Sequence, residues 1–483
     1  MHRLAVAAAL SALLCLPVPG VGQADTRIPQ GEYSARWDSL AARLGPGAVI
    51  GYGATYPADY DFAFRQLPAF DYLTGFREPD AAMVLVHQDD RVALTLFTDR
   101  PTVRTQFYDG FREDPESLAV RTGASVRSLE EFSAVVDSLA GTGLPLFEFR
   151  DFGSGDAVAR DTLTRGRELV RRLEARHAGI EVRDAHATLD RLRARKSEAE
   201  ITLLREAVAL TDEALSRALE VIEPGVWEYQ VEGAILETFR SGGGDGPGYT
   251  PIVGSGINST TLHYVRNDQR MEAGDLVLMD IGAQVAGYSA DLTRTVPVDG
   301  TFTPEQRAVY EIVLEAVEAA EGAARPGATA AASQAAATDV RLRGMAELGL
   351  IQAPEASYDP PWPVDCEARP DQCLQGMLFM IHGISHGIGL EVHDPASFYY
   401  DDGLYTPGDV FTIEPGIYVN ARVLDLLPDT PKNRAFVAAV RGAVERHHAI
   451  GVRIEDDYLM TADGLVRLSD APREIEAIEG AMR

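Results

Sequence analysis

Five side chains in the second half of the chain have residue types and settings that could bind metal ions together. They are Asp280, Asp291, His386, Glu414 and Glu455. Each lies in a short apolar context typical of a β-strand or its end, where four gathered carboxylates would repel one another unless cations lay between them. Hard oxygen ligands with one imidazole nitrogen suit a pair of divalent ions such as Mn²⁺, Co²⁺ or Zn²⁺. The sequence therefore predicts a dinuclear metal centre, provided that the five converge.

The spacing of the two aspartates makes this convergence testable. If Asp280 pairs with Asp291 in an antiparallel hairpin, the turn is centred between Val285 and Ala286, close to the turn-forming Gly287. Like charges placed opposite each other are destabilising, so the pair would need a cation between them. Taken alone, two solvated aspartates on unrelated strands would be the commoner arrangement.

The two glutamates show the alternation of strands. In the run 410–418 Glu414 lies on the face opposite to the apolar residues, and in 451–460 Glu455 shares a face with Arg453. A glutamate inside a strand is rarely buried unless it is paired. An ion pair with Arg453 would account for Glu455 but not for Glu414.

The imidazole belongs to a segment with three histidines, His382, His386 and His393. The spacing of the first two is that of H-E-x-x-H zinc proteases, but Gly383 stands where that motif has its glutamate. The glycines of the segment also oppose a regular helix, so we expect a turn or a strand edge here.

These motifs together resemble those of the M24 metallopeptidases. The matching segments are LTGFREPD (73–80), DIG from Asp280, HGxSH (382–386), TIEPG around Glu414 and RIEDD around Glu455. The resemblance is greatest to the Xaa-Pro aminopeptidase branch, with Xaa-Pro dipeptidases next. It implies an α+β fold in which a pita-bread (creatinase/aminopeptidase) catalytic domain follows a smaller α/β creatinase-like N-terminal domain. Helices and antiparallel strands in separate blocks also favour α+β.

The resemblance also implies roles for individual residues. It places two bridged metal ions, usually manganese in this branch, on Asp280, Asp291, His386, Glu414 and Glu455. It further implies that His263, His382 and His393 line the site. We expect His393 and His263 to contact the oxyanion and the leaving group, and His382 to support the metal ligands. Glu414 would relay a proton to the leaving nitrogen, and Arg453 would hold Glu455 in place.

The implied substrate is a peptide with proline at its second position. A dipeptidase on the same fold is the main alternative, and a non-catalytic binding protein is disfavoured because every ligand position is filled. Gly387 stands where several bacterial relatives carry a bulky aromatic residue. The stretches 354–373 and 420–450 look inserted, and His447 and His448 in the second are expected to face solvent.

The first 24 residues have the pattern of a secretory signal, with Arg3, an apolar run and small residues up to Ala24. The apolar run is too short to span a bilayer, so we expect an exported protein with no membrane anchor after cleavage. The mature chain then has two cysteines, Cys366 and Cys373, which in an exported protein predict a disulfide.

The composition excludes some partners. With 44 basic and 73 acidic residues, the net charge of −29 predicts repulsion from nucleic acid and from anionic lipid. We expect an N-terminal domain over 25–165, a linker helix over 166–196 and the catalytic domain over 197–483. Ser197 to Glu200 and Thr303 to Gln306 predict capping boxes at helix starts, and the glycine-rich 241–248 predicts a flexible loop. Relatives often form homo-oligomers, so we expect one here.

Overall fold

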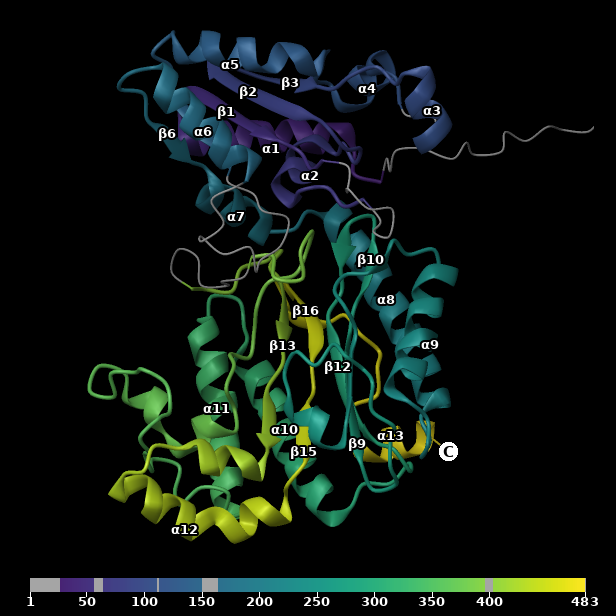
Figure 1. Cartoon of the computed structure of the whole chain (residues 1–483), viewed down its shortest axis with the longest axis vertical. Coiled ribbons are helices and arrows are strands. Elements are labelled where there is room, and N and C mark those ends of the chain that lie inside the picture. The colour runs from purple at the N-terminus through teal and green to yellow at the C-terminus, as the bar shows by residue number, and fades with distance from the viewer. Residues whose placement is uncertain (1–26, 56–63, 111–112, 150–163, 396–402, 483) are drawn as a thin grey trace, which may run out of the picture.

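The computed structural model describes residues 27–55, 64–110, 113–149, 164–395 and 403–482 (Figure 1). In it a smaller N-terminal part lies over a larger C-terminal part. The predicted signal segment, 1–24, lies outside the described residues. In the part of the chain that is described, every helix is too short or too polar to cross a membrane.

The N-terminal part is built around a mixed sheet. Its elements are α1 (Gln30–Leu44), β1 (Gly47–Tyr52), α2 (Pro68–Thr74), β2 (Ala82–Gln88), β3 (Arg91–Phe97), α3 (Val103–Asp109), α4 (Pro115–Thr122), β4 (Ser125–Arg127), α5 (Phe132–Ala140), β5 (Leu146–Glu148), α6 (Arg165–Arg176), β6 (Val182–Asp184) and α7 (His186–Ala194). The strand order is β4-β3-β2-β1-β5-β6. Strand β1 is apolar on both faces because Val49 packs into one buried cluster and Ile50 into another.

The range 166–196 differs from the single linker helix predicted for it. It contains α6, strand β6 and α7, and β6 extends the sheet by pairing parallel with β5. Leu169 and Leu173 of α6 pack into the same buried cluster as Ile50 of β1 and Val136 of α5. The helix ends at Arg176 because His177 is extended (φ −116°, ψ 94°), and Gly179 with a φ of +83° then turns the chain towards β6. Because α6 and α7 are both rich in charged residues, the sequence pattern does not reveal that the helix is interrupted between them.

The C-terminal part consists of helices and antiparallel strands. Its elements are α8 (Glu198–Val221), α9 (Glu228–Ser241), β7 (Gly246–Pro247), β8 (Ile252–Ser255), β9 (Leu276–Ile281), β10 (Ala283–Val285), β11 (Tyr288–Ser289), β12 (Leu292–Pro297), α10 (Pro304–Ala323), α11 (Ala330–Glu347), β13 (Val410–Ile413), β14 (Gly416–Val419), α12 (Pro431–Arg446), β15 (Ile450–Arg453), β16 (Asp456–Thr461), β17 (Gly464–Arg467) and α13 (Ile475–Ala481). Helices α8 and α9 lie on one side of the strands and α11 on the other (Figure 1). The described strand ladders of this part are antiparallel, which confirms the α+β prediction.

Both predicted capping boxes form, at the starts of α8 and α10. The backbone N–H of Ser197 donates to the Glu200 carboxylate at 2.9 Å. The Ser197 hydroxyl also donates to Glu32 of α1 at 2.7 Å, so this helix start is tied to the N-terminal part. One cluster of buried apolar side chains includes Trp37 of α1 and Leu204 of α8, so the two parts share a core.

The two predicted insertions pack against each other. Cys366 and Cys373 are joined by a disulfide, with a Cα–Cα distance of 5.8 Å. Asp359 meets the start of α12, where the Thr430 hydroxyl donates to its carboxylate at 2.6 Å and Lys432 Nζ lies 2.8 Å away. The prediction that both His447 and His448 face solvent is wrong for His447, which is buried, and confirmed for His448, which is exposed.

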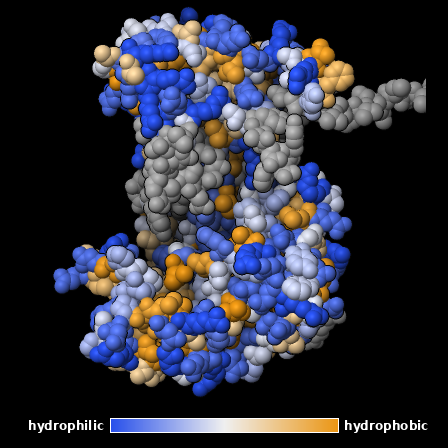
Figure 2. Space-filling model, in the orientation of Figure 1, coloured by the Kyte–Doolittle hydropathy of each residue, from blue (hydrophilic) through white to orange (hydrophobic). Residues whose placement is uncertain are grey.

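Hydrophilic side chains cover most of the face of the molecule shown in Figure 2, with apolar patches mainly on the C-terminal part.

Candidate active site

The two aspartates converge, although not in the predicted register. Asp280 on β9 lies opposite Thr293 of β12, two residues beyond Asp291. The turn falls on Ala286 and Gly287, whose φ angles are +49° and +78°. Two central residues with positive φ are what a type I′ hairpin turn requires, and this turn moves the register by two residues. An even shift keeps the side chains on their predicted face.

Tyr249 shows how close the two aspartates lie. Its hydroxyl oxygen is 2.5 Å from Asp280 Oδ1 and 2.6 Å from Asp291 Oδ1. The sequence did not single out this tyrosine. It follows the glycine-rich stretch predicted to be a flexible loop, part of which is strand β7, paired with β10. The strand partner could not be read from the sequence, so nothing fixed the position of Tyr249.

The two glutamates lie at interruptions of strands that had been predicted to be continuous. Glu414 follows the end of β13 and precedes Pro415, and Glu455 lies between β15 and β16. Proline cannot donate to a strand ladder, which explains the first interruption. The Glu414 N–H instead donates to Ile384 O at 2.8 Å. Glu455 is held by Thr293, whose hydroxyl donates to its carboxylate at 2.7 Å.

The buried imidazole of His386 faces three of the carboxylates. Its Nε2 lies 3.5 Å from Asp291 Oδ2, 3.6 Å from Glu414 Oε1 and 3.9 Å from Glu455 Oε1. Its Nδ1 is 3.1 Å from Gly387 O. Because a carbonyl oxygen only accepts, Nδ1 carries the proton and Nε2 keeps its lone pair. Burial, together with the neighbouring His393, lowers the pKa of His386 to about 3, so the ring is neutral.

The electrostatics of this cluster fit divalent cations. Burial, followed by the charge of Glu455, raises the pKa values of Asp291 and Glu414 well above their usual range. Burial, followed by Asp280, raises the pKa of Glu455 to about 8. The potential ligand atoms of Asp291, His386 and Glu455 lie within 4.8 Å of one another. Buried oxygen donors with one neutral nitrogen form a ligand set suited to Mn²⁺, Co²⁺ or Zn²⁺.

Arg453 contacts more of the site than the predicted support of Glu455. Its Nη2 donates to Asp280 Oδ2 in a very short hydrogen bond, and its Nε lies 3.9 Å from Glu455 Oε2. Its Nη1 donates to the hydroxyl of Tyr418 at 3.0 Å. Since that hydroxyl accepts from arginine, its own proton points to His382 Nε2, 2.7 Å away. Tyr418 is a second residue that the sequence reading missed.

His382 completes this chain next to Glu414. Its Nδ1 lies 3.5 Å from Glu414 Oε2. Burial, followed by Arg453, lowers the pKa of His382 to about 3. A neutral ring that accepts from Tyr418 at Nε2 carries its proton on Nδ1, the nitrogen that faces Glu414. His382 therefore lies beside a predicted metal ligand without joining the His386 cluster.

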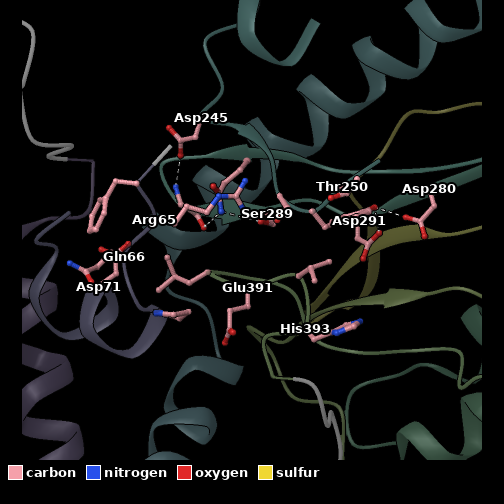
Figure 3. Close-up of a pocket in the computed structure, with 18 of the residues that line it drawn as sticks. Arg65, Gln66, Asp71, Asp245, Thr250, Asp280, Ser289, Asp291, Glu391 and His393 are labelled. Carbon is pink, nitrogen blue, oxygen red and sulfur yellow. Dashed lines mark hydrogen bonds between the residues drawn. The ribbon is translucent and has the colours of Figure 1, made fainter. Parts of the chain in front are cut away.

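The other two histidines line a cleft of about 690 Å³ between the two parts of the chain. His263 and His393 are both exposed in it, and Asp280 and Asp291 also form part of its wall. In Figure 3 Gln66 and Asp71 of the N-terminal part face this cleft from the side opposite to the aspartates. The cleft therefore gives a substrate access to the predicted metal site.

A third missed residue supports the cluster from behind. Asp457 is buried, and its carboxylate accepts from the backbone N–H of Asp291 at 2.9 Å. It is the last aspartate of the RIEDD motif, so the motif itself was the signal that could have identified it.

Comparison with known proteins identifies the family. Residues 202–462 match the profile of metallopeptidase family M24, and residues 33–144 match the N-terminal domain of aminopeptidase P. This chain belongs to metallopeptidase family M24. The family confirms the pita-bread catalytic domain with an N-terminal α/β domain.

Individual relatives are similar over nearly the whole chain. The Xaa-Pro aminopeptidase of Escherichia coli K12 is 32% identical over 472 residues, which are 95% of this chain and 99% of the relative. The human Xaa-Pro dipeptidase is 27% identical, over 96% of this chain and 95% of that protein. The solved structure of proline aminopeptidase P II from Yersinia pestis has a TM-score of 0.77 at 31% identity, over 94% of this chain and 99% of that one. A zinc-substituted E. coli aminopeptidase P with product has a TM-score of 0.76 at 30% identity, over 94% and 98%.

Proposed function

We propose that this protein is an exported Xaa-Pro aminopeptidase, which removes the first residue from peptides that have proline at the second position. The observation that carries the proposal is the meeting of the Asp291, Glu414 and Glu455 carboxylates around His386 Nε2. Asp280 is linked to Asp291 through the Tyr249 hydroxyl. Named relatives with this activity match the chain over nearly its whole length.

The proposal includes two divalent metal ions. Manganese is the first expectation, with cobalt or zinc as alternatives, and the proposed ligands are Asp280, Asp291, His386, Glu414 and Glu455. Such a pair, when bound, supplies a water activated for attack near neutral pH and polarises the scissile carbonyl.

Glu414 is the proposed proton carrier. Its carboxylate lies 3.6 Å from His386 Nε2 and 3.5 Å from His382 Nδ1, which places it beside the proposed metal ions to take a proton and return it to the leaving nitrogen. The neutral His382, fixed by Tyr418 and Arg453, orients that carboxylate from the side away from His386. His393 and His263, which face the cleft, are placed to contact the carbonyl oxygen and the leaving group.

Proline explains why a dedicated enzyme is needed. An X-Pro bond has no N–H, and the ring fixes φ near −65°. Proteases that bind substrates as extended strands through that N–H lose the interaction. The cleft lies between two domains and beside Asp280 and Asp291, which suits the short N-terminal end of a peptide.

Export is supported by the signal pattern of residues 1–24 and by the Cys366–Cys373 disulfide, since such bonds persist in oxidising compartments. A homo-oligomer also belongs to the proposal, on the precedent of relatives. Both are tested by fractionation of cells and by light scattering of the purified protein.

The activity is tested with matched peptides. We expect the metal-loaded protein to release arginine from Arg-Pro-Pro, to leave Arg-Ala-Pro intact, and to lose activity with a chelator until Mn²⁺ is restored. Glycine release from Gly-Pro with no cleavage of the tripeptide would identify a dipeptidase instead. Absence of cleavage of either proline peptide by the metal-loaded protein would contradict a peptidase and favour a binding protein.

A further inference from the structure

The loop 387–395 is bordered by one histidine of the site and contains another. His386 directly precedes it and His393 lies near its end, and their rings pack edge to face with centroids 4.3 Å apart. The two ends of the loop are joined by a backbone hydrogen bond, in which the Asp394 N–H donates to Gly387 O at 2.7 Å. Any shift of Asp394 therefore moves the backbone that places His393.

Asp394 is held by two cations from outside the loop. Its Oδ1 lies 3.0 Å from Arg193 Nε, and its carbonyl oxygen accepts from Lys196 Nζ at 2.6 Å. Arg193 also donates to Glu391 Oε2 at 2.8 Å, so it holds two points of the same loop. Within the loop, Asp394 Oδ2 accepts from the N–H of Leu390 at 2.7 Å.

These two cations are buried and come from the segment that joins the two parts of the chain. Arg193 is 3% exposed and lies in α7, and Lys196 is 6% exposed and directly precedes the N-cap of α8. Burying a cation is costly unless its charge is compensated, and the Asp394 carboxylate provides this for Arg193. Burial lowers the pKa of Lys196, and the nearby Asp394 carboxylate opposes that shift. The neighbouring Arg195 is exposed, and its Nε donates to the Thr406 hydroxyl at 3.3 Å.

Gly389 leaves room for the contacts of Asp394 and Lys196 because it has no side chain. A Cβ at Gly389 would lie 2.4 Å from Asp394 Oδ2 and 3.1 Å from Lys196 Cε. Glycine at 389 thus lets the loop close around Asp394 and against the lysine.

We propose that Arg193 and Lys196 are positioning residues that fix Asp394 and thereby aim the imidazole of His393 into the cleft. This rests on the proposed function for the role of His393 itself. The segment between the domains then does more than connect them, because it sets the geometry of a group that contacts the substrate.

A purely structural role for the pair would have different consequences. It would lower stability and leave the turnover of the folded protein unchanged. A positioning role acts through His393, so its loss changes turnover only while that histidine is present.

The kinetic test uses Lys196→Met, Arg193→Lys and the exposed control Arg195→Gln. Outer residues that orient site groups typically contribute 10- to 100-fold, so we expect kcat on Arg-Pro-Pro to fall by about that factor in Lys196→Met. Arg193→Lys keeps the charge and should fall less, and Arg195→Gln should match wild type. The double variant Lys196→Met/His393→Ala should be no slower than His393→Ala alone. Wild-type kcat in Lys196→Met, or a further multiplicative loss in the double variant, would overturn the proposal.

A second measurement does not depend on activity. Exchange of the backbone amide hydrogens of residues 387–394 should accelerate in Lys196→Met, less in Arg193→Lys, and not in Arg195→Gln. If Lys196→Met does not fold, Arg193→Lys still gives the comparison. Unchanged exchange in the loop refutes the positioning role, whereas a wild-type protein that cleaves no proline peptide refutes only the proposed function.

Discussion

At the scale of the residue, the site depends on a neutral histidine among acids. His386 donates from Nδ1 to a carbonyl of its own loop and turns Nε2 towards three carboxylates. In the same way, Tyr418 accepts from Arg453 and leaves the proton of His382 facing Glu414. In both rings, a hydrogen bond to a partner that can only accept, or only donate, decides which ring nitrogen carries the proton.

Replacement of Glu414 by glutamine tests the proton transfer. Glutamine keeps the shape and an oxygen but cannot carry the proton, so kcat should fall by about 100- to 10,000-fold with little change in KM. Steady-state kinetics on Arg-Pro-Pro measure this. Glu445→Gln on the exposed face of α12 is the matched control, and normal turnover in Glu414→Gln would refute the assigned role.

The five proposed ligands could be selected from sequence because each lies in a short motif with its own apolar neighbours. The residues that support them could not. Tyr249 comes from a glycine-rich stretch, and Tyr418 looks like any apolar strand position. Their role depends on contacts between distant strands, which no local pattern encodes.

At the scale of the element, the alternation of residues predicts which face of a strand a side chain lies on, but not which residue it pairs with on the neighbouring strand. The pairing of Asp280 was displaced by two residues because the turn formed on Ala286 and Gly287. The even shift preserved the face, so the convergence held although the partner was wrong. The capping boxes of α8 and α10 were predicted to the residue, since a cap involves only side chains within one turn.

The disulfide gives a prediction for the inserted elements. A loop closed by cysteines seven positions apart stabilises the fold by about 2 to 3 kcal/mol through the entropy of the unfolded chain. The double replacement Cys366→Ser/Cys373→Ser should therefore lower the free energy of unfolding by about that amount in urea. Turnover by the folded variant should be unchanged, because no contact of the predicted ligands involves this loop within the described residues. A large loss of kcat at temperatures where the variant is folded would contradict this.

At the scale of the whole molecule, the cleft belongs to neither domain alone. Arg65 of the N-terminal part donates to Gly248 O of the C-terminal part at 2.9 Å across its rim. The shared core and the Ser197–Glu32 hydrogen bond also fix the two parts of the chain relative to each other. The N-terminal domain is therefore part of the site's geometry, which composition and periodicity could not show.

The clustered acids make the stability of the metal-free protein depend on pH. The pKa of Glu455 is raised from 4.5 to about 8 in the fold, and those of Asp291 and Glu414 move in the same direction. The folded state then binds more protons than the unfolded state, so stability falls as pH rises towards 8. His382 and His386, with lowered pKa values, act in the opposite sense only below about pH 6.5.

We therefore expect the thermal midpoint of the chelator-treated protein to fall between pH 6.5 and pH 8. Added Mn²⁺ should raise the midpoint more at pH 8 than at pH 6.5. Glu455→Gln is the control and should lose part of the pH dependence. A midpoint of the metal-free protein that is constant or rises over this interval would argue against a cluster of buried acids.

The most direct test of the account is the metal content of the folded protein. After loading with Mn²⁺ and dialysis into metal-free buffer, elemental analysis should find two ions per wild-type chain and fewer in His386→Ala. A wild-type protein that retains no divalent metal and still cleaves Arg-Pro-Pro would contradict it.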